Sequence, residues 1–259
     1  MSMIVRVGQI PYLNCEPFFY GLDTEGIELC PMHPGAMGPL ARAHELDAAP
    51  ISLVQGFDLE DMYEPLGDMG ISVKGPVQSI LLYSKVPAGE LSCATVGVTE
   101  ESATAAQLVR VILEQRFQAQ IREYTALDSS GLDAFLLIGD RALLTHDVVE
   151  GFPYRYDLAE EWLDWMGMPF VFALWMVRRS LDPGLKEMLA ERLTKNLAEN
   201  MACNLKNIAD KRSDLKMTEQ GVADYLMAFR YVLSGEDWQG IEAFRSAWSA
   251  LTLAKGTNR

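Results

Sequence analysis

The sequence places polar side chains directly after short apolar runs, where they could bind or orient a small ligand. The apolar run at 4–10 stops at Pro11, which has no N–H to donate to a sheet, and Tyr12 and Asn14 follow it. In open α/β folds, ligands bind at the carboxyl ends of the strands. Asn14 is therefore a candidate for ligand binding, although it could equally cap the helix that we expect to follow.

Two further polar groups flank predicted strands in the first third of the chain. Ser52 comes directly after the short apolar run at 47–51. A polar loop leads into the strand predicted at 78–84, and its candidate residues are Gly75, Val77, Gln78 and Ser79. Gly75 would let a ligand approach the backbone, although an ordinary turn explains a lone glycine equally well.

Hydroxyl groups cluster at the start of a predicted helix in the middle of the chain. Ser102, Ala103 and Thr104 could present hydroxyls and N–H groups at the positive end of the helix dipole, which suits a carboxylate or phosphate. Simple N-capping explains the same residues. Asp140 follows the apolar run at 134–138 and could cap a helix, bind a ligand or transfer a proton; its position favours the cap.

Composition limits the classes of protein to consider. The chain has 259 residues, a net charge of −14, 49% hydrophobic and 22% charged residues, which suits one large or two modest globular domains. The negative charge disfavours nucleic-acid binding. No apolar stretch is long enough to span a membrane and no signal peptide is visible, so we expect a cytoplasmic protein. Widely spaced cysteines and histidines predict free thiols and no metal site: Cys15, Cys30, Cys93, Cys203, His33, His44 and His146.

The order of the predicted elements indicates two α/β units. Strand patterns alternate with helices in the first half, which predicts a mostly parallel sheet covered by helices. The predicted strands are 27–30, 47–51, 78–84, 95–98, 134–138 and 168–177, and the predicted helices are 39–44, 102–117, 182–210, 218–233 and 237–251.

A polar break at 85–90 separates the two units, with chain crossings expected near 84–87 and 170–175. This order predicts lobe I from 1–85 plus 175–259 and lobe II from 86–174, with a ligand held in the cleft between the lobes. A single continuous sheet is the alternative.

The combined segments resemble the chorismate dehydratase family of the futalosine route to menaquinone. The resemblance covers nearly the whole chain in the right order, although no single segment is decisive. The matching segments are 8–14, 46–52, 70–72, 75–79, 102–104, 136–143, 169–175 and, among the C-terminal helices, 225–248.

The resemblance implies a two-lobed, periplasmic-binding-protein-like (type II) fold and the dehydration of chorismate, a dicarboxylate, without a cofactor. It carries Asn14 and Ser79 over as catalytic residues and the Ser102-Ala103-Thr104 turn as a carboxylate site. Ala105 stands where relatives often have a second hydroxyl, which leaves the number of hydroxyl contacts open. The remaining expected substrate contacts are Tyr12, Ser52, Gly75, Val77, Gln78 and Asp140.

Two other functions stay open at this stage. The sister enzyme of the same pathway cleaves a cyclic futalosine derivative to a dihydroxynaphthoate, and its family uses a different segment where this chain has Ile138-Gly139-Asp140-Arg141. A non-catalytic binding protein for a small acid would bind chorismate without forming product. The sequence does not reveal the oligomeric state, and a homodimer is one of the options.

Overall fold

The computed structural model describes residues 4–145 and 149–256, so His146 lies outside the described residues. The chain forms two compact units, and each contains one β-sheet. Unit 1 comprises 1–72 and 172–233, and unit 2 comprises 73–171 and 234–259. The predicted α/β class with two lobes is confirmed.

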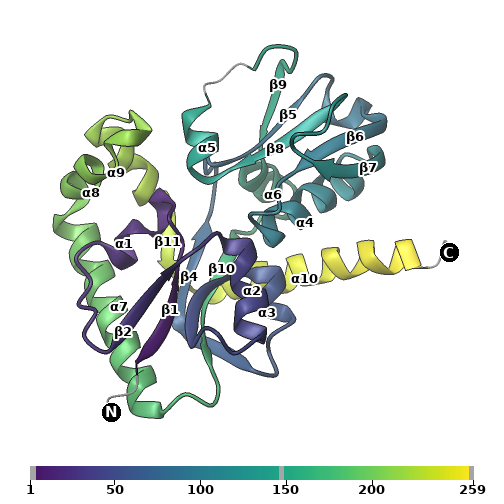
Figure 1. The fold of residues 1–259 in the computed structure, drawn as a ribbon. Helices are drawn as coiled ribbons and strands as arrows, with labels where there is room; N and C mark the ends of the chain where they lie inside the picture. Colours follow the sequence, from purple (N-terminus) through teal and green to yellow (C-terminus); the bar gives the residue numbers. More distant parts are fainter. Residues whose placement is uncertain (1–3, 146–148, 257–259) are drawn as a thin grey trace. The chain divides into compact units, whose positions relative to one another are not determined.

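Unit 1 is built on a six-stranded mixed sheet with the strand order β11-β4-β10-β3-β1-β2 (Figure 1). β1 runs parallel to β2 and β3, whereas β10 is antiparallel to β3. β3 and β10 are buried almost throughout, as their continuous apolar sequences predict. The strands are β1 (Val5–Gln9), β2 (Ile27–Pro31), β3 (Ala48–Ser52), β4 (Tyr63–Val73), β10 (Phe170–Arg178) and β11 (Phe229–Val232).

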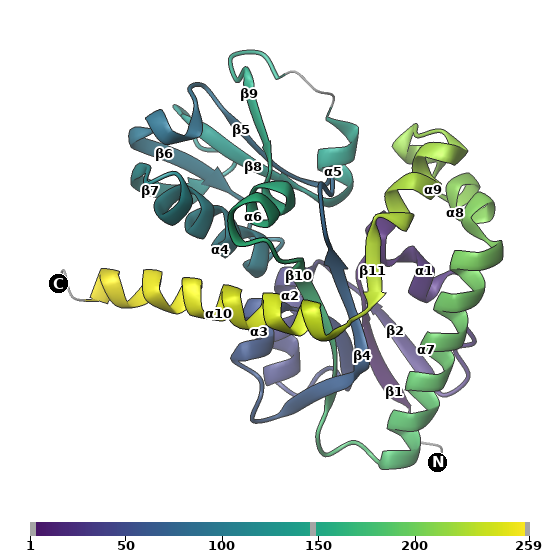
Figure 2. The same ribbon diagram turned by 180° about the vertical axis from the view of Figure 1, so that it is seen from behind.

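The longest helix of unit 1 is α7 (Pro183–Cys203), which lies alongside β1 and β2 (Figures 1 and 2). It begins where the sequence predicts, because Asp182 accepts the N–H groups of Gly184 and Leu185 at 2.9 and 3.2 Å and Pro183 suits the first turn. The other helices are α1 (Glu16–Phe19), α2 (Pro34–Arg42), α3 (Leu53–Phe57), α8 (Leu205–Lys211) and α9 (Glu219–Met227).

Unit 2 contains a five-stranded mixed sheet with the order β7-β6-β8-β5-β9. β6 is parallel to β7 and β8, and β5 is antiparallel to β8 and β9. The buried β8 lies between β6 and β5, which fits its apolar sequence. The strands are β5 (Ile80–Ser84), β6 (Ser92–Val98), β7 (Gln120–Ala126), β8 (Ala134–Ile138) and β9 (Tyr154–Asp157).

The C-terminal helix α10 (Gly235–Gly256) belongs to unit 2 and runs past α6 and α4 (Figure 2). Phe244 of α10 packs edge-on against Trp162 of α6 and Phe170, with ring centroids 5.8 and 5.0 Å apart. The helices of unit 2 are α4 (Ala103–Val111), prolonged by a π-helical turn (Ile112–Arg116), α5 (Gly139–Leu144), α6 (Leu158–Met166) and α10.

The division of the chain differs from the expected lobes at two places. The strand β5 lies in unit 2 because it pairs with β8 and β9, so the chain leaves unit 1 before this strand and not after it. Residues 234–259 also lie in unit 2, because the aromatic contacts of Phe244 attach α10 to α6. Both differences come from long-range pairing that the order of elements alone does not specify.

Four strands were not expected from the sequence, and the sheets are mixed where a mostly parallel sheet was predicted. β7, β9 and β11 are edge strands whose polar, exposed positions weaken the strand pattern. β11 replaces the end of the helix predicted at 218–233. β4 contains Pro65, Gly67 and Gly70, which are residues that weaken a strand pattern. A Cβ on Gly70 would come within 3.0 Å of the Ala173 carbonyl oxygen, so the close packing of the two strands requires this glycine.

The packing of α10 on unit 2 predicts that Gly240→Ala destabilises the protein. A Cβ at this position would overlap the carbonyl oxygen of Pro169, which is backbone and cannot move aside easily. We expect a loss of about 2 kcal/mol in the free energy of unfolding, measured by urea denaturation. Gly235→Ala is the matched control, because its Cβ would meet open space, and it should be neutral or slightly stabilising. Equal stability of the two variants would contradict this packing.

Candidate functional site

The topology of unit 1 brings Tyr12, Asn14 and Ser52 to the same edge of its sheet. β1 and β3 are parallel neighbours, so their carboxyl ends point the same way. Tyr12 and Asn14 follow β1, and Ser52 is the last residue of β3. This edge is the usual place for a ligand in an open α/β sheet, so the sequence-based grouping of these three residues in one region is supported by the strand pairing.

Asn14 lies in a 3₁₀ turn (Leu13–Cys15) whose flanking side chains are fully buried. Its Oδ1 atom is buried and has no hydrogen-bond partner among the described residues. The prediction that Asn14 caps the next helix is wrong, because the N-cap of α1 is Cys15. A buried carbonyl oxygen without a donor costs free energy, and a ligand that donates a hydrogen bond would remove this cost.

Side chains from α7 hold the segment that carries Asn14. Asn196 donates to the carbonyl oxygens of Phe18 and Tyr20 at 2.9 and 3.0 Å, and Asn200 donates to those of Pro17 and Tyr20 at 2.9 and 2.8 Å. The four-residue helix α1 leaves these carbonyls without helical partners, so the amides satisfy them. The segment directly after Asn14 is therefore held by a helix about 180 residues further along the chain.

Tyr12 and Ser52 already have partners inside unit 1. The hydroxyl of Tyr12 lies 3.4 Å from Nδ1 of His33. The hydroxyl of Ser52 is buried and donates to Oε1 of Gln55 at 2.9 Å, and Nε2 of Gln55 donates to the carbonyl oxygen of Gly35 at 2.8 Å. Gln55 thus connects Ser52, at the start of α3, to the start of α2. The hydroxyl oxygen of Ser52 still has the capacity to accept a hydrogen bond.

The predicted residues of unit 2 also meet at one edge of a sheet. β6 and β8 are parallel, so the segments that follow them, including Ser102 and Asp140, lie at the same edge. β5 is antiparallel to β8, so the loop before it, which ends at Ser79, arrives at that edge too. The N–H of Gly139 donates to the carbonyl oxygen of Ser79 at 2.8 Å, which joins two of these segments directly.

A buried carboxylate that the sequence analysis did not single out holds the loop before Ser79. Oδ2 of Asp157 accepts the N–H groups of Val77 and Gln78 at 2.8 and 2.6 Å. Its Oδ1 caps α6 by accepting those of Ala159 and Glu160 at 3.1 and 3.4 Å. Burial raises the pKa of Asp157 above its ordinary value, although the four hydrogen bonds oppose this shift.

The loop held by Asp157 has an unusual backbone. Gln78 is exposed and has a φ of 59°, in the left-handed region that non-glycine residues rarely adopt, and Gly75 has a φ of 143°. The side chains of Val77 and Ser79 point into the unit, where they are 1% and 2% exposed. The sequence carried one signal for this arrangement, because Asp157 stands three residues before Glu160, a spacing typical of a helix cap.

The hydroxyl turn starts α4 as predicted. Ser102 is the N-cap, and its Oγ accepts the N–H of Ala105 at 3.3 Å. Ala103 is half-buried and the Thr104 side chain is fully buried, so Ser102 carries the more accessible hydroxyl of the turn. Asp140 lies in the first turn of α5 and is not its N-cap residue as predicted, because the N-cap position is taken by Ile138.

A cavity of about 330 Å³ adjoins the start of α4 and is lined in part by Thr99, Ser102 and Arg110. The guanidinium carbon of Arg110 lies 4.5 Å from the ring centroid of Tyr124, and its Nε is buried without a hydrogen-bond partner among the described residues. The helix dipole, the hydroxyls and this cation all favour an anion. Glu100 also lines the cavity and opposes this effect. Sequence reasoning did not identify Arg110.

Residues 4–145 and 149–256 contain no helix that is both long and apolar enough to cross a membrane. They also contain no group of three or more His, Cys, Asp or Glu side chains arranged to hold a metal ion.

The two units and their topology define a periplasmic-binding-protein-like fold. A solved protein from Archaeoglobus fulgidus matches with a TM-score of 0.69 at 19% identity, covering 98% of each chain. The alkanesulfonate-binding protein SsuA from Xanthomonas axonopodis pv. citri, bound to MOPS, matches with a TM-score of 0.61 at 11% identity, covering 98% of this chain and 94% of its own.

Sequence comparison narrows this class to one family. A family model described as menaquinone biosynthesis matches residues 5–250, so the chain belongs to that family. A curated chorismate dehydratase from Thermus thermophilus is 28% identical over 256 residues, which cover 91% of this chain and 92% of that protein.

Replacing Asp157 with Asn tests its hold on the loop before Ser79. An amide presents a donor where the carboxylate accepts, so it cannot serve all four N–H groups. We expect the free energy of unfolding to fall by about 2 kcal/mol at neutral pH. Asp164→Asn, at an exposed position of the same helix, is the control and should be nearly neutral. An unchanged stability of the Asp157 variant would contradict the assigned role.

The raised pKa of Asp157 also predicts the sign of a pH effect. A carboxyl group whose pKa is higher in the folded than in the unfolded state takes up its proton first in the folded state, so it adds stability as the pH falls. The difference in the free energy of unfolding between the natural protein and Asp157→Asn should grow as the pH is lowered through the raised pKa of Asp157 towards the ordinary aspartate pKa of 3.8. Urea denaturation at a series of pH values measures this difference, and a decrease on acidification would show a lowered pKa.

Proposed function

We propose that this protein is a chorismate dehydratase, a carbon–oxygen lyase that converts chorismate to 3-[(1-carboxyvinyl)oxy]benzoate and water in the futalosine route to menaquinone. The family membership and the similarity to the Thermus thermophilus enzyme support this reaction. The observation of the structure that supports it best is the buried Oδ1 of Asn14, which lacks a donor at the ligand-binding edge of unit 1.

The chemistry suits polar, uncharged groups. The ring C3 hydrogen leaves as a proton and the C4 hydroxyl leaves with the electron pair of its C–O bond; together they form water, and the ring becomes aromatic. Negative charge that develops at C3 spreads through the ring alkene into the C1 carboxylate. Donors fixed around that carboxylate stabilise this charge more in the transition state than in the ground state, which accelerates the reaction.

Each candidate residue receives a role in this proposal. Asn14 holds the leaving hydroxyl or a substrate carboxylate: its buried Oδ1 can accept the hydrogen of the hydroxyl, and its amide nitrogen can donate. Ser79 is the second catalytic residue of the proposal, and the Ser102 turn binds a carboxylate. The substrate's own enolpyruvyl carboxylate takes the C3 proton, while the protein orients it. Further contacts are proposed for Tyr12, Ser52, Gly75, Val77, Gln78, Ala103, Thr104 and Asp140.

Separate Asn14→Ala and Ser79→Ala variants test the catalytic assignment. We expect each to lower kcat/KM for chorismate by about a hundredfold or more, because each removes a hydrogen-bonding group at the reacting substrate. The ultraviolet absorbance of the aromatic product measures the rate. Ser84→Ala is the control for Ser79: it removes a buried hydroxyl at the other end of β5, where Ser84 bonds to the carbonyl oxygen of Val86 at 2.7 Å.

The same assay separates the competing functions. Unchanged turnover in both variants would remove Asn14 and Ser79 from the mechanism. Saturable binding of chorismate by the natural protein without any product would identify a binding protein. Inactivity on chorismate together with formation of a dihydroxynaphthoate from the cyclic futalosine derivative would identify the sister enzyme.

Two Ser102 variants distinguish a carboxylate site from a simple helix cap. Ser102→Asp keeps a good N-cap but adds a negative charge, so stability should hold while KM for chorismate rises about tenfold. Ser102→Ala loses the cap and about 1 kcal/mol of stability. Urea denaturation and the product assay measure the two effects. If Ser102→Asp leaves KM unchanged, Ser102 only caps α4.

The location and assembly of the protein stay predictions. We propose that it acts in the cytoplasm without nucleic-acid or membrane partners, and as a homodimer if it associates. Light scattering and cell fractionation measure both properties.

A further inference from the structure

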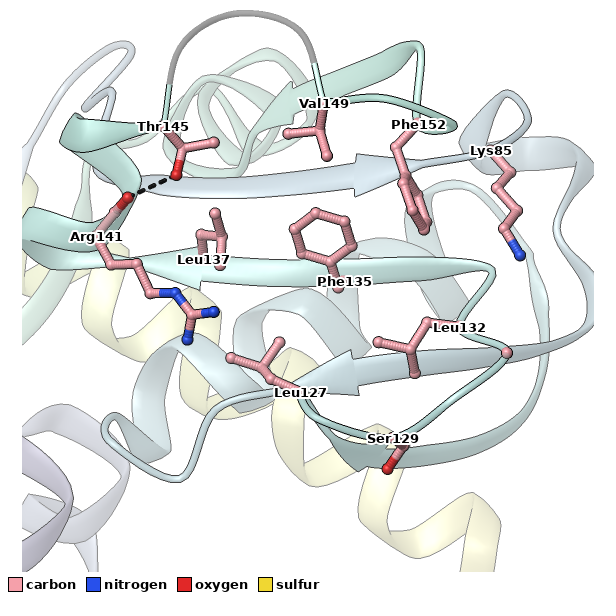
Figure 3. A pocket seen from close by; sticks show the side chains of 11 residues that line it. Lys85, Leu127, Ser129, Leu132, Phe135, Leu137, Arg141, Thr145, Val149 and Phe152 are labelled. Atoms are coloured by element: carbon pink, nitrogen blue, oxygen red, sulfur yellow. Dashed lines mark hydrogen bonds between the residues drawn. The ribbon is translucent and has the colours of Figure 1, made fainter.

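Unit 2 carries a second cavity, on the face of its sheet opposite α10 (Figure 3). Its volume is about 570 Å³, within the range of small-molecule sites. Phe135 and Leu137 of β8 line its floor, and Leu127, which follows β7, and Thr145, which follows α5, lie at its sides (Figure 3). Its apolar lining consists of Leu127, Leu132, Phe135, Leu137, Val149 and Phe152.

The floor of this cavity continues the packed core of the unit. The ring of Phe135 stacks on the buried ring of Tyr83 with centroids 5.3 Å apart and meets that of Phe152 edge-on at 4.8 Å. Leu137 belongs to the buried cluster that includes Leu81 and Tyr83. Because the aromatic rings hold one another, the cavity has a preformed apolar surface that a ligand would cover at little cost in ordering.

Positive charge stands at both ends of the cavity. Arg141 and Lys85 lie at opposite ends of the row of apolar side chains (Figure 3). Among the residues of 4–145 and 149–256 that line the cavity, none is Asp or Glu, although the whole chain has a net charge of −14. An acidic protein can therefore present a locally positive pocket to an anion.

The two cations differ in what they already contact. Nζ of Lys85 lies 3.6 Å from Oδ1 of Asp133 and 5.6 Å from the ring centroid of Phe152. Arg141 is exposed, its carbonyl oxygen accepts the hydroxyl of Thr145 at 2.8 Å, and its guanidinium forms no ion pair with a described residue. Arg141 is thus the cation available to pair with a carboxylate in two-point geometry.

We propose that this cavity binds an amphipathic monocarboxylate, whose carboxylate pairs with Arg141 and whose aliphatic chain covers Leu137, Phe135 and Phe152. The apolar lining separates this ligand from chorismate, whose two carboxylates and hydroxyl would lose water there without enough partners. The site is independent of the proposed dehydratase residues, none of which lines it.

Decanoate, used below its micelle concentration, is the probe for this site. Methyl NMR of the full chain labelled at Leu and Val should show saturable shifts for Leu127, Leu132, Leu137 and Val149. Leu193, which is buried in α7 of unit 1, should not shift. Decylammonium has the same chain and the opposite charge, and its affinity should be at least about tenfold lower, because it meets Arg141 as a like charge.

Arg141→Gln should lower the affinity for decanoate about tenfold, measured by titration calorimetry, because it removes a charged hydrogen bond. Arg122→Gln, which removes the same charge from the edge strand β7, is the control and should change the affinity little. Equal binding of decanoate by the Arg141 variant would overturn the proposal. Methyl shifts confined to other residues would also overturn it. So would methyl shifts that depend on protein concentration and accompany a doubled mass in light scattering, because the cavity would then be a contact between two copies of the chain.

Discussion

One buried carboxylate determines the local structure of the candidate site in unit 2. Asp157 accepts four backbone N–H groups, two from the loop before β5 and two from the first turn of α6. The N–H dipoles and the helix N-terminus offset part of the cost of burying this charge, and burial still raises the pKa of Asp157. The loop can therefore keep Gln78 in the left-handed region and hold Ser79 at the sheet edge, because four hydrogen bonds offset the backbone strain.

Unit 1 has a buried carboxylate of a different kind. Asp47 is 3% exposed, accepts the N–H of Arg6 at 2.8 Å and pairs with Arg178 at 2.6 Å. It precedes β3, whereas Ser52 ends the same strand, so this ion pair stands at the end of the strand away from the polar residues. The charged pair joins β1, β3 and β10 at one end of the sheet, and the hydroxyl and amide groups of Tyr12, Asn14 and Ser52 lie at the other end.

The positions of Asn14 and Ser102 are fixed by different means, and this affects what each can do. The segment after Asn14 is held by Asn196 and Asn200 of α7, and Oδ1 of Asn14 has no donor among the described residues. Ser102 uses its oxygen to cap α4 and keeps its hydroxyl hydrogen, which can donate to an anion. Asn14 thus offers a buried acceptor in unit 1, and Ser102 offers a donor in unit 2.

The sequence by itself determined the α/β class, most strands and the location of the candidate residues at strand ends, because apolar runs of strand length and hydroxyl-rich helix starts are local signals. Only the tertiary structure decided that Asp157 holds the loop at 77–78, that α10 packs in unit 2, and that β7, β9 and β11 complete the sheets. Those features join residues that are 80 positions apart, as for Val77 and Asp157, or 132 positions apart, as for Gln115 and Ala247 of α10, or they lie on polar sheet edges. They follow from long-range hydrogen bonding and packing, for which a linear pattern carries little information.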